Sequence, residues 1–233
     1  MNYFISVSVI TLSFIFSFIS INLSTSLNSW ALQLKDGVKV DSILKFENGG
    51  LKFEFLQTKE QKDKLLELYL GEKDLNYLKY YWGKPQTTFD KDFVKNNVNY
   101  MLELSKAALD EINKKDSKNK LSKVEYLIHD ENGNLVGNIG MYNQNGTDEG
   151  AVAIFVSSQF KGKKLGERAT KALSKLIKEK FVMENLYWEC LDKNVGSNFL
   201  AKKMGFIFHI QNILDQKDPN SEYGKENVYK LKM

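Results

Sequence analysis

The residues best suited to chemistry lie in a lysine- and glycine-rich turn within residues 157–178, directly before a helical pattern. A short apolar run, residues 151–156, precedes them, so the expected order is strand, turn and helix. The turn contains Lys161, Gly162, Lys163, Lys164 and Gly166. The first turn of a helix has unpaired N–H donors and the positive end of the helix dipole. Glycines let the backbone approach a phosphate, and lysines add charge, so this spacing predicts an anion site.

A plain structural role fits the same residues, because a basic, solvated loop before an ordinary helix has a similar composition. Other chemistry has less support. His129 and His209 stand in strand patterns without a partner motif, so we expect packed or surface histidines. Cys190 is the single cysteine, which excludes an internal disulfide and a cysteine-based zinc cluster. No spacing typical of metal ligands occurs, and we expect no metal site.

The elements that must position this turn follow from apolar periodicity. Strand patterns cover residues 51–56, 124–129, 135–142, 151–156, 186–191, 206–213 and 228–233, and helical patterns cover residues 60–70, 93–112, 165–178 and 194–204. An Asn-Gly pair in residues 131–134 predicts a hairpin. Three strands run together before the strand–helix units start, so we expect an α/β fold with a mixed sheet of about seven strands.

Composition places the chain among globular proteins, with 233 residues, 42% hydrophobic and 27% charged. The formal net charge is +4 and is carried by lysine, since Arg168 is the only arginine. Nucleic-acid-binding proteins usually rely on arginine forks, so we expect no nucleic-acid partner. The sequence leaves the oligomeric state open.

The N-terminal residues 1–34 differ in kind from the rest. Residues 3–23 are nearly all apolar or Ser/Thr, and no charged side chain precedes Lys35. About 20 such residues can span a bilayer, and the first lysines follow the run, so we expect a membrane anchor with the domain on the cytoplasmic side. A cleaved signal peptide that exports the domain, a buried core helix and a misassigned start codon stay open. We therefore divide the chain into a hydrophobic segment (1–34), a polar connector (35–49) and a domain (50–233).

Two motifs carry a resemblance to a known family. The run Q-F-K-G-K-K-L-G-E-R-A, residues 159–169, resembles the acyl-CoA loop (Q/R)-x-x-G-x-(G/A) of the GNAT superfamily of N-acetyltransferases. The run N-V-G-S-N-F-L-A-K-K-M-G-F, residues 194–206, resembles the later helix of that superfamily, N-x-x-(A/S)-x(7)-G-F. Both occur in the expected order with a strand between them. The serine in the second motif is most similar to the branch that acetylates ribosomal-protein N-termini.

The resemblance implies the acyl-CoA N-acyltransferase fold, with a mixed, mostly antiparallel sheet flanked by helices, and acetyl-CoA as co-substrate. The pyrophosphate would bind the backbone of Lys161, Gly162, Lys163, Lys164, Leu165 and Gly166, with the pantetheine arm beside Val156 and Asn194. Glu189 would accept a proton from the attacking amine, and Ser197 would assist the leaving thiolate. From the residues alone, Glu189 also fits an exposed or salt-bridged strand position, and Ser197 also fits a helix cap.

Two departures from the family pattern leave a rival function open. Lys164 stands where the loop motif expects Gly or Ala, and Ala201 stands where many relatives place a tyrosine acid. The rivals are a catalytically degenerate acyl-CoA-binding or protein-interaction module, and a membrane-tethered scaffold without a nucleotide ligand. The acceptor amine also stays open: protein N-terminus, lysine, polyamine or antibiotic. Aromatic residues in the range 77–82 could form an acceptor wall or pack into the core.

Overall fold

The computed structural model describes residues 32–73, 78, 81, 90–113, 120–121, 123–143, 148–221 and 223–233. The apolar run at residues 3–23 lies outside these ranges, so the expected N-terminal hydrophobic helix is not shown. Within the described ranges, no helix combines the length and the apolar character that a bilayer crossing requires. Of the predicted aromatic cluster, Tyr77, Tyr80 and Trp82 also lie outside the described residues.

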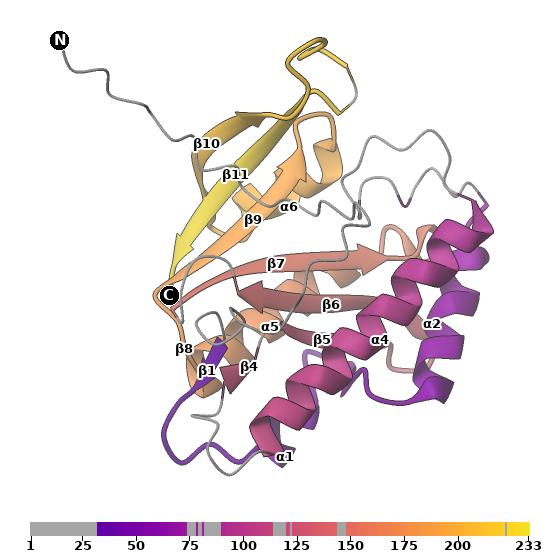
Figure 1. The fold of residues 1–233 in the computed structure, drawn as a ribbon, viewed down its shortest axis with the longest axis vertical. Coiled ribbons are helices and arrows are strands. Elements are labelled where there is room, and N and C mark those ends of the chain that lie inside the picture. The colour runs from indigo at the N-terminus through magenta and orange to yellow at the C-terminus, as the bar shows by residue number, and fades with distance from the viewer. Residues whose placement is uncertain are drawn as a thin grey trace, which may run out of the picture.

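A mixed eight-stranded sheet forms the centre of the molecule, in the order β10-β11-β9-β7-β6-β5-β3-β2 (Figure 1). Its strands are β2 (Lys45–Asn48), β3 (Leu51–Phe55), β5 (Lys123–His129), β6 (Leu135–Asn143), β7 (Glu149–Val156), β9 (Asn185–Leu191), β10 (Ile207–Ile213) and β11 (Lys225–Lys232). Neighbouring strands are antiparallel except β7 and β9, which run parallel. The predicted mixed, mostly antiparallel α/β architecture is confirmed.

The predicted hairpin joins β5 and β6 through a turn that the sequence makes locally. Gly133 has φ 80°, a left-handed conformation that glycine adopts without steric cost. Asp130 closes the turn because its Oδ1 accepts hydrogen bonds from the backbone N–H of Asn132 (3.0 Å) and Asn134 (2.9 Å). Turn chemistry of this kind fixes the register of the strands that follow.

Helices cover both faces of the sheet (Figure 1). On one face lie α2 (Lys59–Leu70) and α4 (Lys91–Asn113), which contact each other and strands β5 and β6. On the other lies α5 (Leu165–Lys180), which contacts β6 and β7, while α6 (Val195–Lys203) packs near β9 and β10. The apolar positions of α5 recur every three or four residues and are buried: Leu165, Ala169, Ala172, Leu173, Leu176 and Ile177. Each face therefore has its own buried apolar cluster.

The last three residues of the expected segment 1–34 and parts of the expected connector 35–49 form secondary structure. Residues Leu32–Leu34 form β1, which pairs with β4 (Lys120–Leu121) and β8 (Phe181–Val182) in a small second sheet. The expected connector holds a short helix, α1 (Asp41–Leu44), and strand β2. Leu32, Leu34 and Ile43 are at most 1% exposed, and each such side chain contributes about 1.5–3 kcal/mol by burial. Their patterns are too short to predict from sequence.

Candidate active site

A cavity opens where β7 and β9 separate. The two strands pair from Glu149 opposite Asn185 to Val152 opposite Trp188, and the register ends there. The remaining residues of both strands diverge and enclose a cavity of about 750 Å³. Its walls come from both strand ends, the turn after β7, the first turn of α5 and helix α6. This volume falls in the range of small-molecule sites.

All predicted site residues except Lys163 line this cavity. They are Val156, Lys161, Gly162, Lys164, Leu165, Gly166, Glu189, Asn194 and Ser197. The Nζ of Lys163 instead lies 5.4 Å from the centre of the Phe160 ring. The fold thus brings the two motifs, separate in sequence, to opposite walls of one cavity.

The turn between β7 and α5 exposes backbone donors to the cavity. A short 3-10 helix, η3 (Ser158–Phe160), leads into it, and α5 begins at Leu165. Gly162 has φ 84°, and a Cβ built there would meet no atom within 4 Å, so a ligand can approach its backbone. Gly166 has a different reason to be glycine, because a Cβ there would lie 3.2 Å from Leu200 Cδ2 on α6. Glycine therefore lets α5 pack closely on α6, whereas a larger residue would make the Leu200 side chain shift by a few tenths of an ångström.

Lys164 occupies the position directly before α5 in an unusual backbone conformation. It is the one non-glycine residue in the described ranges with a positive φ, at φ 55° and ψ 23°. Left-handed backbone favours glycine, one of the two residue types that the motif expects here, and it is strained for lysine. Its side chain forms no capping hydrogen bond to α5 in the described structure. The first-turn donors of α5 therefore have no side-chain cap and face the cavity.

Basic residues that the sequence analysis missed also reach the cavity from the α6 side. Lys193 and Lys203 both line it. Glu167 on α5 lies between two lysines, with Lys203 Nζ at 2.7 Å from its Oε2 and Lys171 Nζ at 2.8 Å from its Oε1. Hydrogen bonds from Lys171 and then Lys203 lower the pKa of Glu167 to about 2. Part of the positive charge at this wall is therefore balanced by a permanent carboxylate.

Glu189 points to the face of β9 opposite Trp188 and Cys190. The Tyr142 hydroxyl on β6 donates a hydrogen bond to Glu189 Oε2 at 3.1 Å. Trp188 and Cys190 are buried on the other face, at 2% and 5% exposure. This alternation follows from strand geometry and places Glu189 on the face of β9 that carries the contact with Tyr142, while all three residues line the cavity. Tyr142 itself was not predicted, since it lies on a strand that carries no motif.

The second motif builds the wall that faces the turn. Asn194 caps α6, because its Oδ1 accepts a hydrogen bond from Ser197 N–H at 3.1 Å. The Ser197 hydroxyl accepts a hydrogen bond from Trp188 Nε1 at 2.8 Å, so Ser197 is not the helix cap that one interpretation assigned. Burial raises the pKa of the neighbouring Cys190 thiol to about 12, although Ser197 opposes this shift through a hydrogen bond. Ala201 is fully buried in the core and offers no polar group.

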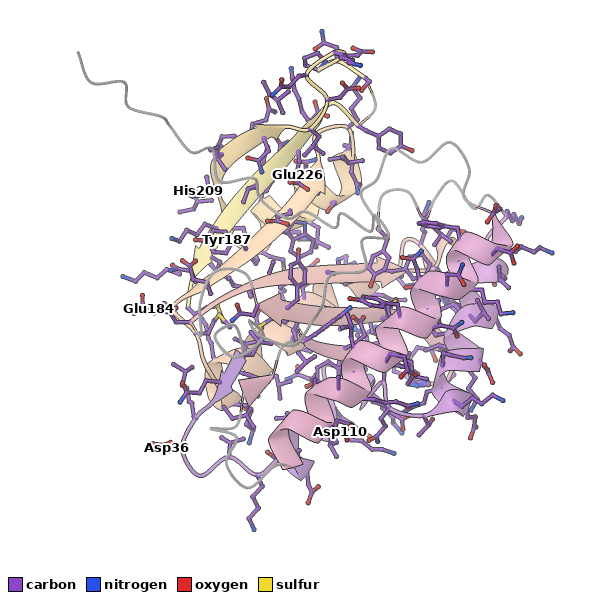
Figure 2. All side chains as sticks on the ribbon, in the orientation of Figure 1. Asp36, Asp110, Glu184, Tyr187, His209 and Glu226 are labelled. Carbon is purple, nitrogen blue, oxygen red and sulfur yellow. The ribbon has the colours of Figure 1, made fainter. Side chains whose placement is uncertain are left out.

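Further wall residues come from elements distant in sequence. Glu226 on β11 lines the cavity at 7% exposure, close to β9, the strand that carries Tyr187 (Figure 2). Of the predicted aromatic cluster, Tyr81 lines the cavity, and its hydroxyl accepts a hydrogen bond from Asn138 Nδ2 at 2.7 Å.

His209 is exposed on β10, with its ring 6.1 Å from that of Tyr187. Among the described residues, no group of His, Cys, Asp and Glu side chains could hold a metal ion.

Several solved structures with a similar fold are described as acetyltransferases. A probable acetyltransferase aligns with a TM-score of 0.61 and 16% identity, over 81% of this chain and 96% of its own. The ribosomal-protein-S5-alanine acetyltransferase from Vibrio fischeri aligns with a TM-score of 0.58 and 13% identity, over 81% and 96%. The microcin C7 self-immunity acetyltransferase MccE, solved with acetyl-CoA and AMP, gives 0.58 and 15%, over 80% and 94%. The TM-scores show that these proteins share a fold with this chain, and at such low identities the comparison shows the fold alone.

Sequence comparison identifies the family directly. A search of curated protein sequences gives no significant match. The family model described as "Acetyltransferase (GNAT) domain" matches residues 67–207, which are more than half of the chain and include both motifs. The chain therefore belongs to the GNAT family of N-acetyltransferases.

Proposed function

We propose that this protein transfers an acetyl group from acetyl-CoA to a primary amine by direct attack of the amine. The observation that carries the proposal is the cavity where β7 and β9 part, with the uncapped start of α5 on one wall and Glu189 on the other. The similar fold of MccE, which was solved with acetyl-CoA, supports this choice of acyl donor.

The residues of the turn fit the phosphates of this donor. The open space at Gly162 admits a phosphate oxygen, and the N–H groups of residues 162–166 can donate to it, whereas the N–H of Lys161 donates to the carbonyl oxygen of Ser158 at 3.4 Å. The ammonium groups of Lys161, Lys164 and Lys203 add charge from two walls. Val156 at the end of β7 and Asn194 at the start of α6 flank the opening in which the pantetheine arm would lie. Asn194 Oδ1 caps α6, so the side-chain amide nitrogen of Asn194 would donate a hydrogen bond to the pantetheine arm.

Glu189 is the proposed general base. An ammonium has no lone pair, so a proton must leave the acceptor before attack, directly or through a water. The hydrogen bond from Tyr142 to Oε2 orients the carboxylate of Glu189, which lines the cavity and would accept that proton. The Ser197 hydroxyl accepts from Trp188, and its O–H would turn from the neighbouring Cys190 thiol to donate to the departing thiolate. A tyrosine acid at position 201 plays no part, because that residue is a buried alanine.

The acceptor class is proposed as a protein N-terminus. Similar folds include the ribosomal-protein-S5-alanine acetyltransferase and an enzyme that modifies the N-terminal serine of ribosomal protein L7/L12 from Salmonella typhimurium. We further propose that residues 3–23 anchor the domain on the cytoplasmic side of a membrane, where acetyl-CoA is available. Protease protection of the domain in sealed vesicles would test this location, and cleavage from outside would contradict it.

Free-thiol release from acetyl-CoA with a panel of N-terminal peptides, lysine peptides, polyamines and aminoglycosides tests the activity. Glu189→Gln should lower kcat by about 10²–10⁴-fold with CoA affinity nearly unchanged, because a positioned base contributes that much. Glu184→Gln, an exposed carboxylate change outside the cavity, is the matched control. Tight CoA binding without thiol release for any acceptor would instead favour the degenerate binding module.

A further inference from the structure

A buried carboxylate outside the cavity holds the start of the phosphate-binding turn. Glu72 follows the last turn of α2 and is only 5% exposed. Its Oε1 accepts a hydrogen bond from the backbone N–H of Ser158 at 2.9 Å, and its Oε2 accepts from the hydroxyl of the same serine. Ser158 is the first residue of η3, which leads directly into the turn.

Three more hydrogen bonds hold the same point. The Gln159 amide donates to the carbonyl oxygen of Gly71 at 3.2 Å, so η3 is joined to the end of α2 by two neighbouring residues. On the sheet side, Ser157 N–H donates to the carbonyl oxygen of Val136 at 2.9 Å. The fully buried Ser157 hydroxyl accepts from Gln159 N–H at 3.4 Å. Residues 157–159, which lead into the turn, are therefore held between β6 and the end of α2.

The turn between these fixed points is short and has two left-handed residues. Residues 161–164 join η3 to α5, and Gly162 and Lys164 both have positive φ. The far end is fixed because Leu165 is buried at 3% exposure. The directions of the intervening N–H groups depend on both ends, so a shift at Ser158 would move the donors away from a common focus.

We infer that Glu72 is a positioning residue for the turn that binds the pyrophosphate, an inference that rests on the function proposed above. A carboxylate suits this position because Ser158 offers two donors, its backbone N–H and its hydroxyl. Each oxygen of Glu72 accepts one of these two hydrogen bonds. Hydrogen bonds to an ionised carboxylate are about twice as strong as neutral ones. A buried carboxylate persists only where such donors compensate its lost hydration.

The role predicts a selective loss of affinity. Pantetheine lacks the pyrophosphate, so it uses the groove between β7 and β9 but not the turn. Glu72→Ala should weaken CoA binding about tenfold or more, while binding of pantetheine changes less than twofold. The KM for acetyl-CoA should rise by the same factor, with kcat and the KM for the amine little changed.

Isothermal titration of the full chain with CoA and with pantetheine measures the two affinities. Glu67→Ala, an exposed carboxylate change on the same helix, is the matched control and should affect neither ligand. Glu72→Gln should recover part of the CoA affinity, since its amide can still bridge to Ser158. Ser158→Ala removes one of the two hydrogen bonds with little change in volume, and it provides the same comparison if Glu72→Ala does not fold.

Two outcomes would overturn the inference while the proposed function stands: CoA affinity unchanged in Glu72→Ala and Ser158→Ala, or equal loss for CoA and pantetheine, which indicates general destabilisation. A wild-type protein that binds no CoA would overturn the proposed function and this inference together. Selective loss of CoA affinity in both alanine variants supports the positioning role.

Discussion

Replacing Lys164 with glycine tests both the conformation and the charge of the turn. The left-handed conformation costs a lysine about 1–2 kcal/mol relative to the right-handed region. Glycine removes that cost, but the flexibility it adds to the unfolded chain opposes the gain by about 0.5–1 kcal/mol. Lysine forms no capping hydrogen bond that would be lost. We therefore expect Lys164→Gly to raise the free energy of unfolding by about 0.5–1 kcal/mol, or the Tm by about 1–4 °C.

The same change should have the opposite effect on ligand affinity. The Lys164 side chain lines the cavity, and a solvent-exposed ion contact contributes about 0.2–1 kcal/mol. Loss of the ammonium should weaken CoA binding by up to about fivefold, and added salt should shrink the difference. Lys164→Met separates the two effects, because it removes the charge and keeps the strained backbone. It should lower CoA affinity as glycine does, without a gain in stability.

Urea denaturation and calorimetric titration of the three proteins measure these quantities. The strain argument is refuted if Lys164→Gly is no more stable than Lys164→Met. If both variants bind CoA more tightly than the wild type, the lysine crowds the site and the charge argument is wrong.

Three further predictions concern other groups at the site. Gly162→Asp should abolish CoA binding by titration, because the side chain adds bulk in a left-handed turn and a negative charge beside the phosphates, whereas Gly162→Ala should retain part of it. The pKa of Glu167 is lowered from 4.5 to about 2, so its contribution is present above pH 4.5 and is lost as the pH falls toward 2. Stability at low salt should therefore fall more steeply over that range in the wild type than in Glu167→Gln, and equal slopes would count against the ion pair with Lys203. The raised pKa of Cys190, about 12, predicts that iodoacetamide leaves this buried thiol unmodified in the native protein and labels it in guanidinium; rapid native labelling would contradict this.

Local patterns in the sequence were sufficient for most of the fold. The Asn-Gly hairpin, the helix after the lysine-rich turn and the strands on either side follow from turn chemistry and periodicity, which depend on residues close in the chain. Strand β2 was missed because it has four residues and one aromatic anchor, Phe46, whose ring stacks 4.4 Å from that of Phe53 on the neighbouring strand. That contact exists only once the sheet has formed.

In the candidate site, too, some features follow from local sequence and others only from the tertiary structure. Residue types and spacing predicted a strand, a basic turn and a helix start suited to an anion, and strand alternation predicted that Glu189 points away from Trp188 and Cys190. The partners of these groups lie far away in sequence: Tyr142 with Glu189, and Glu72 with Ser158. No local pattern specifies such pairs.

The sequence by itself therefore determined the order of strand, glycine-containing turn and helix start, and from that order it predicted an anion site. Only the tertiary structure decided where β7 and β9 part, what else lines the opening and which buried carboxylate holds the turn. The physical reason is the separation in sequence over which the interactions act. Backbone conformation follows from neighbours within a few residues, whereas a cavity and its electrostatics depend on which distant strands and helices pack together.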